Sequence, residues 1–130
     1  MKLEHIAFDV SEPEALITWW CKNLGFRRSS PGSAFIFDCS GVSGIEVYRT
    51  DKTASAPNYA AQNAMTMHIA FAVENVAAEA QRLVDAGGTL ESLSVDKPDF
   101  HMAIVRDPWG IPIQLCWRAK SVFLAPCPIN

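Results

Sequence analysis

The chain has 130 residues and a formal net charge of −3 at pH 7, and 49% of its residues are hydrophobic while 19% are charged. This composition is typical of one folded domain and excludes a disordered chain. The small negative charge, with no basic run, argues against nucleic acid as a partner, and no apolar stretch is long enough to span a membrane.

The sequence opens directly on a strand-like alternation, MKLEHIAFDV, where a secreted protein would carry a signal peptide. Its four cysteines are isolated, and none belongs to a CxxC pair. We therefore expect a cytoplasmic protein whose cysteines are reduced and mostly buried.

A strand pattern occurs twice, as HIAFDV at residues 5–10 and as HIAFAV at residues 68–73. A segment with helical spacing of its apolar residues follows each copy, at 11–26 and at 74–88. Ser11 is the expected N-cap of the first helix, and Gly25 lies near its end. A glycine pair at 87–88 suits the end of the second helix.

Three short strand-like runs follow each helix. They are expected around 26–30, 33–38 and 44–49 in the first half, and at 89–94, 101–106 and 111–117 in the second. The first strands are 63 positions apart and the last two are 68 apart, which indicates a five-residue insertion near SVDKPDF. The chain therefore reads as a repeat of one βαβββ module.

These runs predict an α+β fold of two tandem βαβββ modules, at 1–49 and 65–118. A polar linker at 50–64 joins them, and an extended tail at 119–130 follows. Because one module of this size buries too little surface to be stable alone, we expect the two to pair. The expected result is a curved, mostly antiparallel mixed sheet around a central pocket.

Polar residues recur on one face of the predicted strands. Alternation directs Ile6 and Phe8 toward the helix, and His5 toward the opposite face. The same reasoning applied to the other strands gives a set of four: His5, Glu46, His68 and Gln114. Two imidazoles, a carboxylate and an amide oxygen can ligate a divalent ion and leave positions for water or substrate. The alternative is a symmetric hydrogen-bonded cluster that fills the core.

The segment VRDPWGIP predicts a hairpin whose four-residue loop is 107–110, which places residue 103 opposite residue 114. The equivalent hairpin of the first half brings aromatic side chains beside Glu46, an arrangement suited to a partly apolar small molecule. The predicted pocket residues are Phe35, Phe37, Tyr48, His101 and Ala103. For His101, the alternative is a surface position at the start of a strand.

The paired modules, the histidine that opens each first strand and the segment RDPWGIPIQL together resemble the vicinal-oxygen-chelate superfamily. This group includes glyoxalase I, fosfomycin-resistance proteins, extradiol dioxygenases, methylmalonyl-CoA epimerase and bleomycin-resistance proteins. The resemblance covers residues 1–118. It implies a metal site built from the first and last strand of each module, with His5, Glu46, His68 and Gln114 at the ligand positions. It also implies a homodimer and a divalent ion such as Ni, Zn, Co, Mn or Fe(II).

The sequence departs from this resemblance at Gln114, because the position is typically a glutamate in glyoxalase I, in the dioxygenases and in the fosfomycin enzymes. In glyoxalase I that glutamate is also linked to proton transfer. A glutamine can coordinate through its amide oxygen but cannot accept a proton at neutral pH. Proton transfer would therefore fall to the catalytic candidate Glu46.

Three functions follow from these observations. The first is a metal-dependent lyase or isomerase resembling glyoxalase, which chelates vicinal oxygens of a small substrate and transfers a proton through Glu46. The second is a non-haem iron(II) dioxygenase that uses two histidines and one carboxylate. The third is a metal-free small-molecule binding protein of the bleomycin-resistance type.

Overall fold

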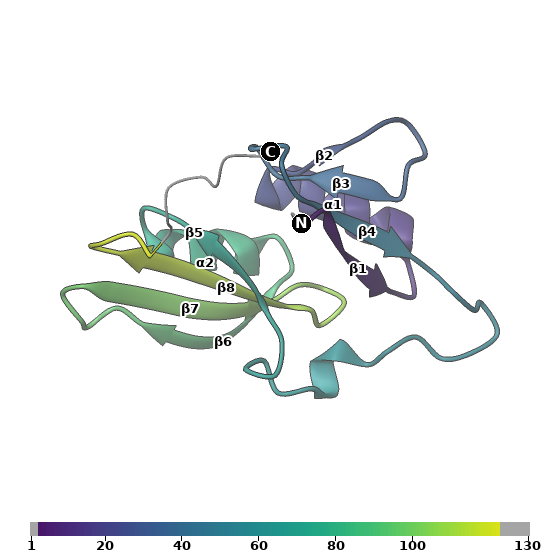
Figure 1. Cartoon of the computed structure of the whole chain (residues 1–130). Coiled ribbons are helices and arrows are strands. Elements are labelled where there is room, and N and C mark those ends of the chain that lie inside the picture. Colours follow the sequence, from purple (N-terminus) through teal and green to yellow (C-terminus); the bar gives the residue numbers. More distant parts are fainter. Residues whose placement is uncertain (1–2, 123–130) are drawn as a thin grey trace. The chain divides into compact units, whose positions relative to one another are not determined.

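The computed structural model of the chain describes residues 3–122, which form two compact units (Figure 1). Unit 1 contains the chain up to residue 62 together with 108–111, and unit 2 contains 63–107 and the chain from 112 onward. The boundary thus falls inside the predicted linker. Each unit holds one βαβββ module, which confirms the α+β fold of two tandem modules. No helix within residues 3–122 has the length and apolar character to cross a membrane.

The first module forms a four-stranded mixed sheet in the order β1-β4-β3-β2. β1 and β4 are parallel, and the other neighbouring strands are antiparallel. The elements of this module are β1 (His5–Asp9), α1 (Pro13–Leu24), β2 (Arg27–Arg28), β3 (Phe35–Phe37) and β4 (Gly44–Tyr48).

The second module repeats this topology in a separate sheet, in the order β5-β8-β7-β6. Its elements are β5 (Ile69–Ala72), α2 (Val76–Asp85), β6 (Thr89–Ser94), β7 (Phe100–Arg106) and β8 (Pro112–Arg118). Every predicted helix and strand is therefore present, with its ends shifted by a few residues. The strands thus form two sheets, one for each module.

Conformational preferences of proline and glycine determine where the helices begin and end. Pro13 is the first residue of α1, and a residue before proline is driven out of the helical region, so the N-cap is Glu12, with φ −134° and ψ 71°. The prediction of Ser11 as N-cap is wrong for this reason. Gly25 ends α1 in the left-handed conformation, and the pair at 87–88 donates both amides back to the last turn of α2.

Each helix covers one face of its own sheet and leaves the other face open. In unit 1, Trp20 is fully buried, and its ring lies 6.3 Å from that of Phe8. In unit 2, Leu83 of α2 is fully buried, as are Val105 and Ile113 of the sheet that α2 covers. Burying one such side chain stabilises a fold by about 1.5–3 kcal/mol. The open faces are therefore where polar side chains of the strands can gather.

Part of the predicted linker packs on unit 1. It forms a short 3₁₀ helix, η1 (Tyr59–Ala61), and the buried Tyr59 donates its hydroxyl proton to the carbonyl of Asp9 at 2.9 Å. Gly110 of the predicted DPWG turn lies against the same helix, with a positive φ of 86°. A Cβ at this position would come within 2.6 Å of the backbone nitrogen of Ala60. The close approach explains why the turn carries a glycine there.

The three described cysteines are free thiols. Cys21 and Cys116 are half-buried, whereas Cys39 is exposed, which is a departure from the expectation of mostly buried thiols. Burial raises the pKa of Cys21 above its ordinary value, so this thiol is held in its unreactive protonated form. Cys127 and the rest of the predicted tail beyond residue 122 lie outside the described residues.

Candidate metal centre

In unit 1, His5 and Glu46 lie together on the open face of the sheet. The parallel register pairs Ala7 of β1 with Glu46 of β4, so alternation brings His5 to the same face. The Nε2 atom of His5 is 3.6 Å from the Oε2 atom of Glu46, and about a third of each side chain is exposed (32% and 29%). The prediction that these two residues share a face is confirmed.

The other ring nitrogen of His5 is occupied. Its Nδ1 atom lies 2.5 Å from the Oε2 atom of Glu4. A carboxylate accepts hydrogen bonds, so Nδ1 is the donor to Glu4 and Nε2 is the ring nitrogen that faces Glu46. An imidazole held in this way by an oxygen acceptor is the usual arrangement of a metal-ligating histidine.

Aromatic side chains surround this pair, as predicted for the first half. Phe35 pairs with Glu46 across β3 and β4, and its ring stands edge-on to that of His5 at 5.3 Å between centroids. Phe37 lies over Gly44 so closely that a Cβ there would be 2.7 Å from the phenyl ring. Tyr48 follows on the same face at the end of β4 and is partly exposed. A substrate-binding role for these three residues stays a prediction.

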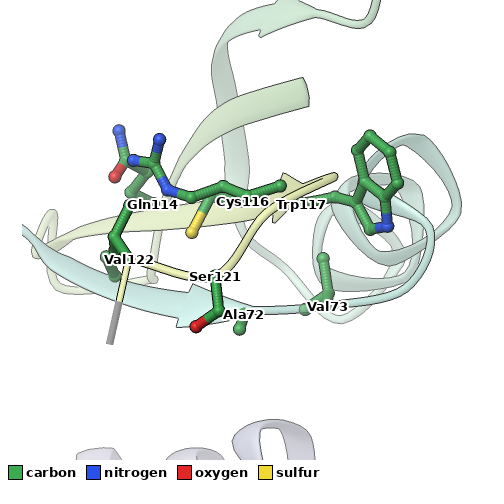
Figure 2. Close-up of a pocket in the computed structure, with 9 residues that line it drawn as sticks. Ala72, Val73, Gln114, Cys116, Trp117, Ser121 and Val122 are labelled. Atoms are coloured by element: carbon green, nitrogen blue, oxygen red, sulfur yellow. The ribbon is translucent and has the colours of Figure 1, made fainter. Parts of the chain in front are cut away.

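In unit 2, His68 directly precedes β5 and is half-buried. Its Nδ1 atom is 3.1 Å from the carbonyl oxygen of Ala64, which again can only accept, so Nε2 is the atom left for a ligand. Gln114 lies on the open face of β8 opposite Ala70 of β5. Its amide nitrogen is 4.0 Å from the sulfur of Met102. Figure 2 shows Gln114 and Cys116 among the side chains that line a pocket.

The predicted register of the last hairpin is wrong by one residue. Ala103 lies opposite Leu115, and His101 lies opposite Trp117, because the loop between β7 and β8 has five residues (107–111) and not four. Ala103 is fully buried, and the ring of His101 stacks on that of Trp117 at 5.1 Å. His101 and Ala103 therefore lie on the face opposite to Gln114 and do not join it as expected.

The separation of His5 and Glu46 fits two ligands of one divalent ion. Two donors about 2.1 Å from an ion at a tetrahedral angle are about 3.4 Å apart, close to the separation of His5 and Glu46. The other two predicted ligands, His68 and Gln114, both belong to unit 2. Between residues 3 and 122, no three histidine, cysteine or acidic side chains gather as a metal-holding group. One pair alone therefore does not complete a site.

The model of the glyoxalase-like domain family matches residues 5–116, nearly the whole described chain. The chain belongs to this family. The family lies within the vicinal-oxygen-chelate superfamily, whose members typically use a divalent metal ion. The resemblance drawn from the repeated HIAF strands and the DPWG turn is thereby confirmed.

Solved structures share the fold of this glyoxalase-like domain at low sequence identity. The antibiotic-binding protein TnmS3 from Streptomyces sp. CB03234 is 17% identical, with a TM-score of 0.65 over 92% of this chain and 97% of that one. A glyoxalase-related enzyme from Fulvimarina pelagi is 18% identical, with a TM-score of 0.67 over 91% and 88%. A member of the glyoxalase/bleomycin resistance/dioxygenase superfamily from Sphaerobacter thermophilus is 13% identical, with a TM-score of 0.63 over 91% and 98%. No curated protein matches the chain.

Sequence reasoning missed the two residues that orient the histidines. Glu4 could have been suspected, because it directly precedes His5. Ala64 acts through its backbone carbonyl, which no side-chain pattern signals. The predicted pocket residues also did not include Ala70 and Ala72, which line the pocket of unit 2.

Proposed function

We propose that this glyoxalase-like domain is a metal-dependent lyase or isomerase that acts on a small molecule with oxygens on adjacent carbons. The observation that carries the proposal is the matched state of two histidines. In both, an oxygen acceptor binds Nδ1, and in His5 the remaining nitrogen faces Glu46 at 3.6 Å. Histidines that served only to fill the core would not need to use Nδ1 for the hydrogen bond and leave Nε2 for a ligand in both modules.

The proposed ligands are His5, Glu46, His68 and Gln114. When bound, a divalent ion would polarise the two substrate oxygens and stabilise negative charge on them. The carboxylate of Glu46 has two oxygens, so that one can serve as ligand and the other can accept the proton from the substrate carbon. Gln114 lacks this basicity and serves only as a neutral ligand. Phe35, edge-on to His5, gives the apolar part of a substrate a surface to contact.

The test is solvent exchange of a carbon-bound proton. Protein loaded with Ni(II) or Zn(II) is incubated in D₂O with hydroxyacetone and with the hemithioacetal of methylglyoxal, and deuterium uptake is followed by NMR. We expect exchange with wild type and a loss of about a hundredfold or more with Glu46→Gln, which should still hold metal. Glu12→Gln is the control, since Glu12 contacts Trp109 instead of a histidine. Exchange that persists in Glu46→Gln would contradict the assignment.

A binding protein without catalysis is the second candidate. The observation that favours it is the pocket of about 450 Å³ in unit 2, a size typical of small-molecule sites. The fold is also that of an antibiotic-binding protein, TnmS3. Wild-type protein that binds small molecules but takes up no metal and exchanges no proton would establish this second function.

The iron(II) dioxygenase is distinguished by the identity of the ion. Two histidines and the carboxylate of Glu46 make the ligand set of such enzymes. Iron in the purified protein together with oxygen uptake on catechols would select it over the lyase. Homodimerisation also stays a prediction, and sedimentation equilibrium measures it directly.

A further inference from the structure

The pocket of unit 2 is bordered by β5 and β8 (Figure 2). Ala70 and Ala72 of β5 pair with Gln114 and Cys116 of β8, and the side chains of all four line it. The methyl groups of the two alanines leave open the space that larger side chains would fill. The cavity of about 450 Å³ is thus built into the sequence of the strands.

The lining of this pocket is apolar with one charged group. Val73 and Val122 add further apolar side chains, and among residues 3–122 Arg118 is the only charged residue that lines the pocket. Alternation along β8 brings Arg118 to the same face as Gln114 and Cys116. In the part of the chain that the structure describes, no aspartate or glutamate lines the cavity to balance this charge.

Arg118 is also held in place. Its guanidinium carbon lies 4.2 Å from the centre of the ring of Phe100, its partner across β7 and β8. Among residues 3–122 it forms no salt bridge. A guanidinium above an aromatic ring still has its N–H groups at the edge of its own plane. There they can bind an oxyanion in a bidentate manner.

We propose that this pocket binds a small, mainly apolar molecule that carries one acidic oxyanion group, and that Arg118 pairs with that group. The inference rests on the proposed function, because it names the class of substrate, although binding itself requires no metal. The apolar part lies against the alanine floor formed by Ala70 and Ala72. Gln114 connects the two sites, since it is a proposed metal ligand and lines this cavity.

The experiment uses the full chain, freed of metal with EDTA, and two matched probes. These are 8-anilinonaphthalene-1-sulfonate and its uncharged counterpart N-phenyl-1-naphthylamine, titrated by calorimetry. We expect the sulfonate to bind one site at least tenfold more tightly than the neutral probe. Arg118→Gln should remove that difference and leave the neutral probe unaffected. Arg27→Gln, a change of an exposed arginine in unit 1, should alter neither affinity.

A larger side chain in the pocket tests the location of the binding site. Ala72→Phe should weaken both probes at least tenfold. In wild type, the sulfonate should also slow the alkylation of Cys116 by N-ethylmaleimide, read by mass spectrometry, while exposed Cys39 reacts at an unchanged rate. This second measurement needs no variant. Equal affinities for the two probes, an unaffected Arg118→Gln variant, or no protection of Cys116 would each overturn the inference.

These outcomes separate the two proposals. If the probes bind as expected but the protein takes up no metal, the proposed class of ligand stands and the proposed metal-dependent reaction is wrong. If the histidines take up metal but the sulfonate does not protect Cys116, the proposed metal-dependent reaction stands and the proposed class of ligand is wrong.

Discussion

His68 donates its Nδ1 proton to the backbone carbonyl of Ala64 across 3.1 Å, and His5 directs the same ring atom to the carboxylate of Glu4. The two modules thus reach one ring state through different partners, a turn backbone in one and a neighbouring side chain in the other. Both arrangements engage Nδ1, leave Nε2 as the other ring nitrogen and limit rotation of the ring. This shared state supports the proposed metal-ligating role of each histidine.

Removing the partner of His5 should weaken metal binding. Because Glu4 is largely exposed, we expect Glu4→Ala to reduce Zn(II) affinity by about tenfold, the lower end for residues that orient ligands. Titration calorimetry at fixed pH measures it. Glu74→Ala, the same change of charge at an exposed position in unit 2, should have no such effect. Equal losses in both variants would show a general charge effect and no orientation of His5.

Restoring a carboxylate at the position of Gln114 should strengthen metal binding. A charged oxygen ligand attracts a divalent ion more strongly than a neutral amide, so Gln114→Glu should raise affinity on the order of tenfold. Competition with a chromophoric chelator measures the change. The exposed Gln62 supplies the matched variant Gln62→Glu, which should leave affinity unchanged. An unaltered affinity in Gln114→Glu would place this residue outside the metal site.

The packing of the DPWG turn should be sensitive to one methyl group. Gly110→Ala introduces a Cβ against the backbone of Ala60 and requires a left-handed residue at φ 86°, so we expect a loss of about 2–4 kcal/mol in the free energy of unfolding. Gly41→Ala shares the positive φ but meets no atom within 4 Å. Urea denaturation should therefore show a clearly smaller loss for Gly41→Ala, and equal losses would refute the steric explanation.

A salt bridge gives stability that depends on pH. Arg28 binds the carboxylate of Glu14 with two nitrogens, at 2.8 and 2.6 Å, and this lowers the pKa of Glu14 below its ordinary value. A lowered pKa contributes stability above the unfolded-state value that disappears as the pH falls through the folded-state value. Glu14→Gln should therefore be less stable than wild type at pH 7 and equally stable at pH 2. A difference that persists at pH 2 would assign the effect to packing.

The order of elements could be predicted because it follows from local patterns. The HIAF repeat, the glycine pair at 87–88 and the period-two alternation all act within a few residues. The register of the last hairpin could not be predicted in this way. Its loop has one more residue than expected, and Gly110 and Ile111 of that loop belong to unit 1. Ser11 failed as a cap because the conformational restriction before Pro13 outweighed the preference for serine.

The candidate site was predictable only in part. Alternation along paired strands brings His5 and Glu46 together, and the same rule assigns Gln114 to an open face. The sequence pattern gives no sign of the hydrogen bond from His68 to Ala64, because that bond depends on the position of a backbone carbonyl.

The central claim is that two histidines, one in each module, hold a divalent ion. The direct measurement is elemental analysis of protein purified without chelators or an affinity tag, for wild type, the double variant His5→Ala/His68→Ala and the single variant His101→Ala. His101 is the third histidine of the chain and stacks on Trp117 away from the proposed ligands. We expect near-stoichiometric metal in wild type and in His101→Ala, and its loss in the double variant. Wild-type protein that contains no metal and takes up neither Ni, Zn, Mn nor Fe(II) on titration would contradict it.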